Sequence, residues 1–247
     1  MIKIEELSKS FGDKDVLNAV SLDFESGQTT VVLGRSGSGK SVLLKLILRL
    51  MPLESGRIYV DGVDTTDFGE QEMMSVRRKM GMLFQGSALF DSMNVYENVA
   101  YALREHTKLS EDEIKNQVAE NLSFVELSGT ELLMPSELSG GMQKRIALAR
   151  AMAASPNYIF FDEPTTGLDP ITAQTINELI KRVQVQTGTT VIVVTHDLES
   201  TAFVGQKLVL LRDGEIYFEG TPEEFQTSEL EHVITFRTGG KVTSDYE

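Results

Sequence analysis

The chain has 247 residues, which suits one large α/β domain or two small ones. The absence of cysteine excludes disulfides, zinc–thiolate sites and a cysteine nucleophile, and three histidines argue against a histidine-rich metal site. The 23 Lys and Arg against 37 Asp and Glu give a net charge of −14, which argues against nucleic acid as a partner. No signal-peptide core and no apolar run of the roughly 18 residues needed for a spanning helix are visible, so we expect a soluble, cytoplasmic chain.

Strands dominate the first part of the chain. The predicted strands there are residues 2–5, 16–24, 29–33, 56–62 and 80–84. A helix is expected after Gly39, because apolar residues recur on one helical face. That face comprises Val42, Leu43, Leu46, Ile47 and Leu50.

Residues 86–156 change to helical character. Asn94 with Glu97, and Ser110 with Glu113, have the spacing of capping boxes, and a third helix is expected from about Gly141 to Ala154. Beyond this segment strands return, at residues 158–162, 190–195, 207–211 and 215–220. Between the first two of these, a helix is expected to begin at Asp169–Pro170 and to end at Gly188.

A phosphate-binding loop is the clearest motif. Residues Gly34, Arg35, Ser36, Gly37, Ser38, Gly39, Lys40 and Ser41 match G-x-x-x-x-G-K-[ST] between a predicted strand and a predicted helix. The glycines let backbone N–H groups point at phosphate oxygens, and the helix N-terminus adds a positive dipole. Lys40 would reach the β- and γ-phosphates, and the Ser41 hydroxyl would hold Mg²⁺. The alternative is an ordinary glycine-rich turn.

Two acids end the apolar run YIFFDE. Buried charge is costly, so packing explains Asp162 and Glu163 poorly. Asp162 suits the Mg²⁺ shell through a bound water, and Glu163 suits a general base for the attacking water. The alternative is that both acids mark the exit of the strand into solvent.

Two further polar residues end predicted strands. His196 follows TVIVVT and could contact the γ-phosphate, although a lone histidine there is more often a surface or capping residue. Gln85 ends the MGMLF strand, where its amide could reach the metal or the water. Because ligands bind at the carboxyl ends of parallel strands, these residues together predict a catalytic site for ATP and Mg²⁺.

Leu138-Ser139-Gly140-Gly141-Met142, together with Gln85, the Gly167-Leu168-Asp169 turn and His196, resembles the nucleotide-binding subunit of ABC transporters. The resemblance covers residues 1 to about 225. It implies an α/β fold of the ABC ATPase type: a P-loop NTPase with a RecA-like parallel sheet core, an N-terminal antiparallel β region and a helical insertion. The implied domain is 1–228, with 1–85 and 157–228 as the core, 86–156 as the helical subdomain and 229–247 as a tail.

The resemblance also implies how two copies cooperate. Phe11 would stack on adenine, although it is otherwise better counted as a core residue. Ser139, Gly140 and Gly141 would bind the γ-phosphate of ATP held by a second copy, and Asp169 would lie in the turn that faces that copy. A two-fold homodimer would complete both sites.

Met142 departs from the glutamine common in this family, and LSGGM is similar to the ATPases of Mla- and MCE-associated lipid transport systems. The run LFQGSALFDSMNVYENVA over residues 83–100 also looks like that subfamily. In ABC subunits this segment receives the permease. The resemblance thus implies phospholipid transport through an integral-membrane permease at the cytoplasmic face of the inner membrane.

The implied further partners are an MCE-domain lipid-binding subunit and a small regulatory subunit. An importer ATPase for a small solute such as an amino acid is the alternative, and an ABC ATPase acting on ribosomes or DNA is disfavoured by the single set of motifs and the acidic charge. The tail contains no catalytic residues; HVITF could form a short helix, and residues 239–247 look mobile.

Overall fold

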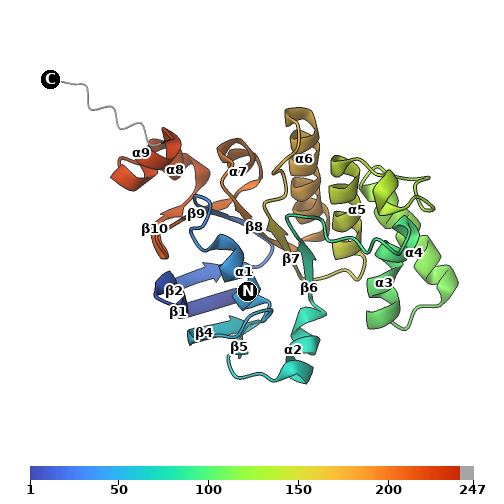
Figure 1. The fold of residues 1–247 in the computed structure, drawn as a ribbon, viewed down its shortest axis with the longest axis horizontal. Coiled ribbons are helices and arrows are strands. Elements are labelled where there is room, and N and C mark those ends of the chain that lie inside the picture. The colour runs from blue at the N-terminus through green and yellow to red at the C-terminus, as the bar shows by residue number, and fades with distance from the viewer. Residues whose placement is uncertain (240–247) are drawn as a thin grey trace. The chain divides into compact units, whose positions relative to one another are not determined.

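The computed structural model, drawn as a ribbon in Figure 1, describes residues 1–239. These residues cluster into two compact units. Unit 1 comprises residues 1–66 together with the chain from residue 194 onward, and unit 2 comprises residues 67–193. The end predicted to be mobile, apart from Gly239, lies outside the described residues.

Unit 1 begins with the predicted antiparallel β region. Its four strands, in the order β2-β1-β4-β5, are β1 (Ile2–Phe11), β2 (Lys14–Phe24), β4 (Ser55–Val60) and β5 (Val63–Asp64). All three pairings are antiparallel. Apolar residues such as Ile2, Ile4 and Ile58 are fully buried, so the alternation seen in the sequence builds the apolar face of this sheet.

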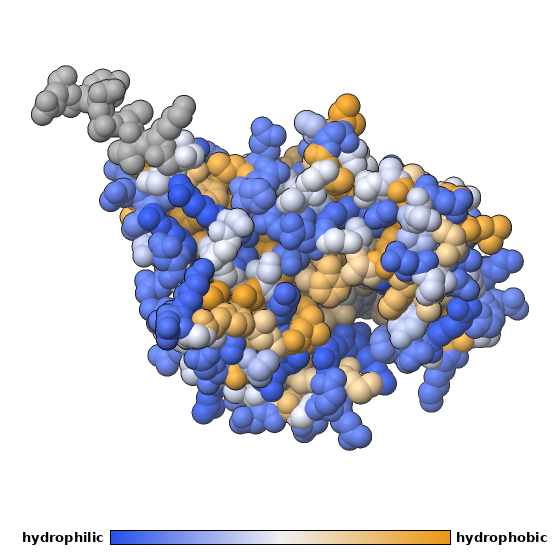
Figure 2. All heavy atoms as spheres, in the orientation of Figure 1, coloured by the Kyte–Doolittle hydropathy of each residue, from blue (hydrophilic) through white to orange (hydrophobic). Residues whose placement is uncertain are grey.

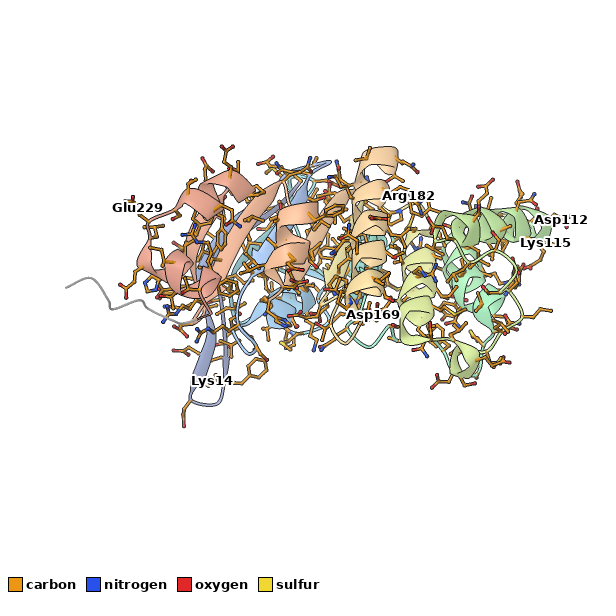
Figure 3. The ribbon with its side chains drawn as sticks, turned by 90° about the horizontal axis from the view of Figure 1, so that it is seen from above. Lys14, Asp112, Lys115, Asp169, Arg182 and Glu229 are labelled. Atoms are coloured by element: carbon orange, nitrogen blue, oxygen red, sulfur yellow. The ribbon has the colours of Figure 1, made fainter. Side chains whose placement is uncertain are left out.

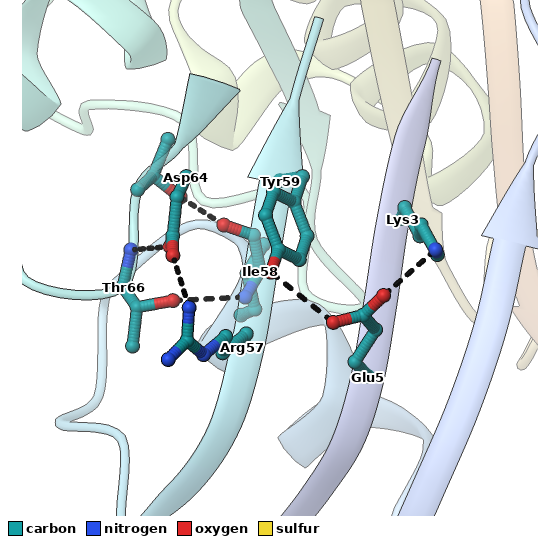
Figure 4. A network of polar contacts seen from close by, with 8 residues as sticks. Lys3, Glu5, Arg57, Ile58, Tyr59, Asp64 and Thr66 are labelled. Carbon is teal, nitrogen blue, oxygen red and sulfur yellow. Dashed lines mark hydrogen bonds and ion pairs between the residues drawn. The ribbon is translucent and has the colours of Figure 1, made fainter. Parts of the chain in front are cut away.

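Polar side chains tie the strands of this sheet together (Figure 4). Glu5 on β1 forms an ion pair with Lys3 at 2.7 Å and accepts a hydrogen bond from the Tyr59 hydroxyl at 3.1 Å. On β5, Asp64 pairs with Arg57 at 3.3 Å. The Lys3–Glu5 pair lies within β1, whereas the Tyr59 and Arg57 contacts join neighbouring strands; the two ion pairs are solvent-exposed and contribute little to stability.

Unit 1 also holds parallel strands. Its remaining elements are β3 (Thr29–Leu33), α1 (Lys40–Ile47), α7 (Leu198–Val204), β9 (Lys207–Arg212), β10 (Glu215–Gly220), α8 (Pro222–Thr227) and α9 (Glu231–Arg237). β3 runs parallel to β9, and β10 is antiparallel to β9. The Gly34 amide donates to the Thr195 carbonyl at 3.3 Å, so the end of β8 (Thr190–Thr195) lies beside the end of β3. All residues of β3 are buried, as expected of a central parallel strand.

Unit 2 contains the helical segment. Its elements are α2 (Glu70–Arg77), β6 (Met80–Leu83), α3 (Val95–His106), α4 (Glu111–Phe124), η1 (Pro135–Glu137), α5 (Gly140–Met152), β7 (Tyr158–Asp162), α6 (Pro170–Thr187) and the first residues of β8. β6 is parallel to β7, and the Thr190 amide donates to the Asn157 carbonyl where β8 begins. The strands therefore supply the parallel core that was predicted.

The local signals for helix ends are confirmed. Asn94 and Ser110 cap α3 and α4 in capping boxes, and Gly188 ends α6 with φ +66°. One expected packing position was wrong. α1 ends at Ile47, so Leu50 lies beyond the helix and is half exposed, while Leu44 is buried instead. The predicted domain limits at 85/86 and 156/157 stay a prediction.

Polar residues dominate the face of the molecule drawn in Figure 2, with apolar residues scattered among them. This agrees with the net charge of −14. Within residues 1–239, no helix is both long and apolar enough to cross a membrane.

Candidate nucleotide site

The phosphate loop connects β3 to α1, so the strand–loop–helix context predicted for it is confirmed. A Cβ on Gly34 would lie 2.4 Å from both the Leu211 carbonyl oxygen and the Ser38 hydroxyl, so only glycine fits. Gly39 caps α1 with φ +101°, a conformation that side-chain-bearing residues rarely adopt. The loop geometry therefore requires glycine at positions 34 and 39.

Lys40 lies within this loop. Its side chain is 5% exposed, and Nζ donates hydrogen bonds to the carbonyls of Gly34 at 2.7 Å and Arg35 at 3.1 Å. These bonds fix the ammonium group close to the first turn of α1, where the helix dipole also favours an anion. The unit thus presents a fixed positive charge and a helix N-terminus at one place.

Phe11 is not a core residue. It ends β1, its side chain is 48% exposed, and the Lys9 ammonium lies 5.5 Å from its ring centre. The turn that follows leads to Lys14, which Figure 3 places in the β1–β2 hairpin. An exposed ring at a hairpin is available to stack on a flat ligand.

A cavity of about 380 Å³ adjoins the loop in unit 1. Its walls are Arg35–Ser38, the start of β2 at Lys14–Val16, the end of β9 with its turn, and α9. The predicted short helix at HVITF is confirmed as α9, and His232, Thr235 and Phe236 line this cavity. Sequence reasoning missed this contribution because nothing local links the tail to the loop.

In unit 2, Asp162 ends β7 and Glu163 follows it, both less than 10% exposed. Glu163 has φ +48°, a strained conformation for a residue with a side chain and one that clusters at functional sites. The Thr166 hydroxyl donates to its carboxylate at 3.1 Å. The burial of both acids excludes the alternative that they simply exit into solvent.

Lys144 on α5 is a buried cation that the sequence analysis missed. It is 5% exposed and donates to the Gln85 backbone carbonyl. Burial lowers the pKa of Lys144, and the negative charges of Asp162 and Glu163 oppose that shift. The signal was present in the sequence, because Lys144 falls on the buried face of the helix between Gly141 and Ala147.

The structure leaves the side chains of Gln85 and His196 at exposed positions. Gln85 follows β6 by two residues in unit 2, and His196 follows β8 directly in unit 1. Both therefore occur at strand ends as predicted, and their catalytic roles stay predictions.

Ser139 and Gly140 lie at the N-terminus of α5, as predicted. Ser139 is the N-cap, and its hydroxyl accepts the Met142 amide at 3.3 Å. Gly140 is exposed, and a Cβ there would meet only Leu168 at 3.9 Å. By contrast, a Cβ on Gly141 would lie 2.4 Å from Thr172 Cγ2. Packing against Thr172 therefore requires glycine at position 141. At position 140 packing does not require glycine.

Gly140→Ala and Gly141→Ala are therefore expected to differ. Gly140→Ala should leave the melting temperature unchanged or slightly raised, because alanine is the better helix former, yet lower ATPase activity at least about tenfold if this turn binds phosphate. Gly141→Ala should destabilise the chain by about 1–3 kcal/mol through overpacking. Thermal unfolding and ATPase assays measure both effects; full activity of the stable Gly140→Ala variant would remove this turn from the site.

Asp169 is the N-cap of α6, and Arg182 lies farther along the same helix (Figure 3). Its carboxylate accepts the amides of Ile171 at 3.1 Å and Thr172 at 3.0 Å, and the Thr172 hydroxyl at 2.5 Å. Thr172 is also the neighbour of Gly141, so these contacts link the first turns of α5 and α6.

The hydroxyl and amide of Thr172 lower the pKa of Asp169 from its ordinary 3.8. The stabilisation is present above that value and is lost as pH falls through the lower folded-state pKa. We expect Asp169→Ala to lower the melting temperature at pH 7, and the difference from wild type to shrink below pH ~4. Melting curves from pH 7 to pH 2.5 test this, and a difference that grows towards low pH would contradict it.

A groove in unit 2, with a volume of about 420 Å³, is lined by β6, α3 and α5. The rings of Phe90 and Tyr101 are 5.1 Å apart at its edge, and each side chain is 41% exposed. It includes part of the 83–100 segment that the sequence analysis singled out.

Together, the glycine loop with its buried lysine and the strained carboxylate after a buried strand define a nucleotide-binding P-loop domain. A model of the ABC transporter family matches residues 17–166, and this chain belongs to that family as an ABC ATPase.

Two curated relatives match nearly the whole chain. It is 42% identical over 240 residues to the intermembrane phospholipid transport system ATP-binding protein MlaF of Haemophilus influenzae, covering 97% of this chain and 90% of that protein. It is 40% identical over 241 residues to the probable ribonucleotide transport ATP-binding protein mkl of Mycobacterium leprae, covering 98% and 70%.

Among solved structures, a dimeric ATP-binding cassette in a post-hydrolysis state, bound to ADP and phosphate, matches with a TM-score of 0.83. It is 34% identical and covers 90% of this chain and 99% of that one. The predicted fold class and the ABC ATPase identity are confirmed.

Proposed function

We propose that this chain powers phospholipid transport through a separate integral-membrane permease. The observation that carries the proposal is the 42% identity to a phospholipid transport ATPase over 90% of that protein's length. The 83–100 segment and Met142 favour the same subfamily. The ribonucleotide named for mkl is the second candidate substrate, because its identity is close behind at 40%.

The catalytic roles follow from the chemistry of each residue. Gly34–Ser41 bind the phosphates of ATP, and the exposed ring of Phe11 stacks on adenine. Glu163 accepts the proton of the attacking water, with Thr166 orienting its carboxylate. His196 contacts the γ-phosphate.

Mg²⁺ is the implied metal. Within residues 1–239, no group of three or more His, Asp, Cys and Glu side chains forms a metal cage. This agrees with Mg²⁺, which takes one or two carboxylates and completes its shell with water and phosphate oxygens. The hydroxyl of Ser41, the amide oxygen of Gln85 and Asp162, through a water, are hard oxygen donors that fit. When bound, the metal neutralises charge on the phosphates.

The active form is a homodimer, in which Ser139–Gly141 of one copy contact ATP on the other. Support comes from the exposed, sterically unconstrained Gly140 at the start of a 13-residue helix and from the dimeric state of a solved relative. Asp169 orders the neighbouring turn that faces the second copy.

The Phe90–Tyr101 groove receives the permease, since an exposed aromatic pair beside a cavity suits a docking helix. An MCE-domain lipid-binding subunit and a small regulatory subunit complete the transporter, and this chain sits at the cytoplasmic face of the inner membrane. No nucleic acid takes part, in keeping with the charge of −14.

The test is purification of the native membrane complex, followed by identification of its subunits and bound small molecules. An MCE-domain protein and co-purified phospholipid are the expected result. A receptor for a ribonucleotide or an amino acid in their place would overturn the lipid assignment.

A further inference from the structure

Two cations of α5, the buried Lys144 and the partly exposed Arg150, hold one short turn of the chain, residues 85–88. Lys144 Nζ donates to the Gln85 carbonyl. Arg150 donates from Nη1 to the Ala88 carbonyl at 2.7 Å and from Nη2 to the Ser87 carbonyl at 3.0 Å. The two cations are six residues apart on the helix, which is about 9 Å along its axis. Lys144 therefore contacts the start of the 85–88 turn, and Arg150 contacts its end.

The 85–88 turn has a conformation that needs such support. Ser87 has φ +62° and Ala88 has φ +50°, and two successive residues with side chains rarely occupy this region. Inside the turn the Ala88 amide donates to the Gly86 carbonyl at 2.7 Å. The carbonyls of Ser87 and Ala88 accept from Arg150. Strain of this kind persists only where neighbouring groups fix it.

Lys144 is buried and Arg150 is partly exposed. Burial lowers the pKa of Lys144, and the negative charges of Asp162 and Glu163 partly offset that effect. Burial lowers the pKa of Arg150, whose guanidinium also lies 5.6 Å from the centre of the Phe90 ring. Arg150 and Phe90 both line the groove described above. One helix of unit 2 therefore holds the 85–88 turn and lines the groove, and its Lys144 interacts electrostatically with Asp162 and Glu163.

We propose that Lys144 and Arg150 are positioning residues: from α5 they fix the conformation of the 85–88 turn and thereby the place of Gln85. The inference rests on the proposed catalytic and metal-binding function of Gln85. Loss of either cation releases a strained turn, so Gln85 is misplaced while the Gly34–Ser41 loop that binds the phosphates is untouched.

Hydrogen–deuterium exchange of the nucleotide-free chain tests, independently of catalysis, whether Lys144 and Arg150 hold the 85–88 turn. Lys144→Met removes the charge and the donor at nearly constant length, and Arg150→Lys removes the two-pronged contact while keeping the charge. Both variants should speed exchange over residues 84–90 by about tenfold or more. The matched control is Arg145→Met on the same helix, because Arg145 bonds instead to the carbonyls of Val125 and Glu126.

Steady-state ATPase kinetics of the complex with its permease then test whether holding the 85–88 turn matters for hydrolysis. Lys144→Met and Arg150→Lys should lower kcat by about tenfold or more with KM for ATP within about twofold, because nucleotide binding belongs to other residues. Arg145→Met should match wild type. If Lys144→Met fails to fold, Arg150→Lys carries both tests.

The outcomes separate the two claims. Wild-type complex without ATPase activity would defeat the proposed function and leave the exchange result standing. An active wild type whose Lys144 and Arg150 variants exchange and hydrolyse like Arg145→Met would overturn the inference. A rise in KM with unchanged kcat would also overturn it, because the cations would then act on nucleotide binding.

Discussion

Glu163→Gln is expected to lower ATP hydrolysis by roughly 10²- to 10⁴-fold, the range typical for loss of a general base. Glutamine preserves the shape of the side chain and can still accept the Thr166 hydroxyl, which bonds to Glu163 at 3.1 Å. The buried position after β7 and the strained backbone should therefore persist. Because ATP binding rests on other residues, the variant should bind ATP and accumulate as closed dimers.

Phosphate release and size-exclusion chromatography with ATP measure the two consequences of Glu163→Gln. Glu178→Gln is the matched control, since it makes the same change at an exposed carboxylate on α6. Near-normal turnover by Glu163→Gln would remove this residue from the role of general base.

Lys40→Ala should weaken ATP binding by roughly 10- to 100-fold, because a hydrogen bond from a charged donor contributes about 1.5–3 kcal/mol. The substitution also removes the bonds from Nζ to the carbonyls of Gly34 and Arg35, which hold the loop in its curl. Binding of a fluorescent ATP analogue measures the effect. Lys45→Ala, at an exposed position on the same helix, controls for loss of charge, and equal affinity in the two variants would contradict the assignment.

Local signals allowed much of the fold to be predicted. The phosphate loop, the capping boxes at Asn94 and Ser110 and the left-handed Gly188 each depend on a few neighbouring residues, so the sequence contains them in full. α2 and α7 were missed because neither shows an apolar stripe: α2 buries only Met73 and Val76, and two of the three buried residues of α7 are polar. Leu50 was misplaced because its helix stops early.

Contacts between distant segments could not be predicted in the same way. The bond from Lys144 to residue 85 and the lining of a cavity by Phe236 join residues far apart in sequence. A buried lysine on an apolar helical face was a visible signal, but its partner was not. Likewise, the sequence analysis assigned one role to Ser139, Gly140 and Gly141. In the structure, Thr172 leaves no room for a side chain at position 141, whereas position 140 is open.

The most direct test of the account is ATP-dependent movement of labelled phospholipid between vesicles by the purified complex of this chain with its permease. We expect transfer that requires ATP and Mg²⁺, stops in Glu163→Gln and is unaffected in Glu178→Gln. ATP hydrolysis without phospholipid movement, together with ATP-dependent uptake of a ribonucleotide or an amino acid by the same complex, would contradict the account.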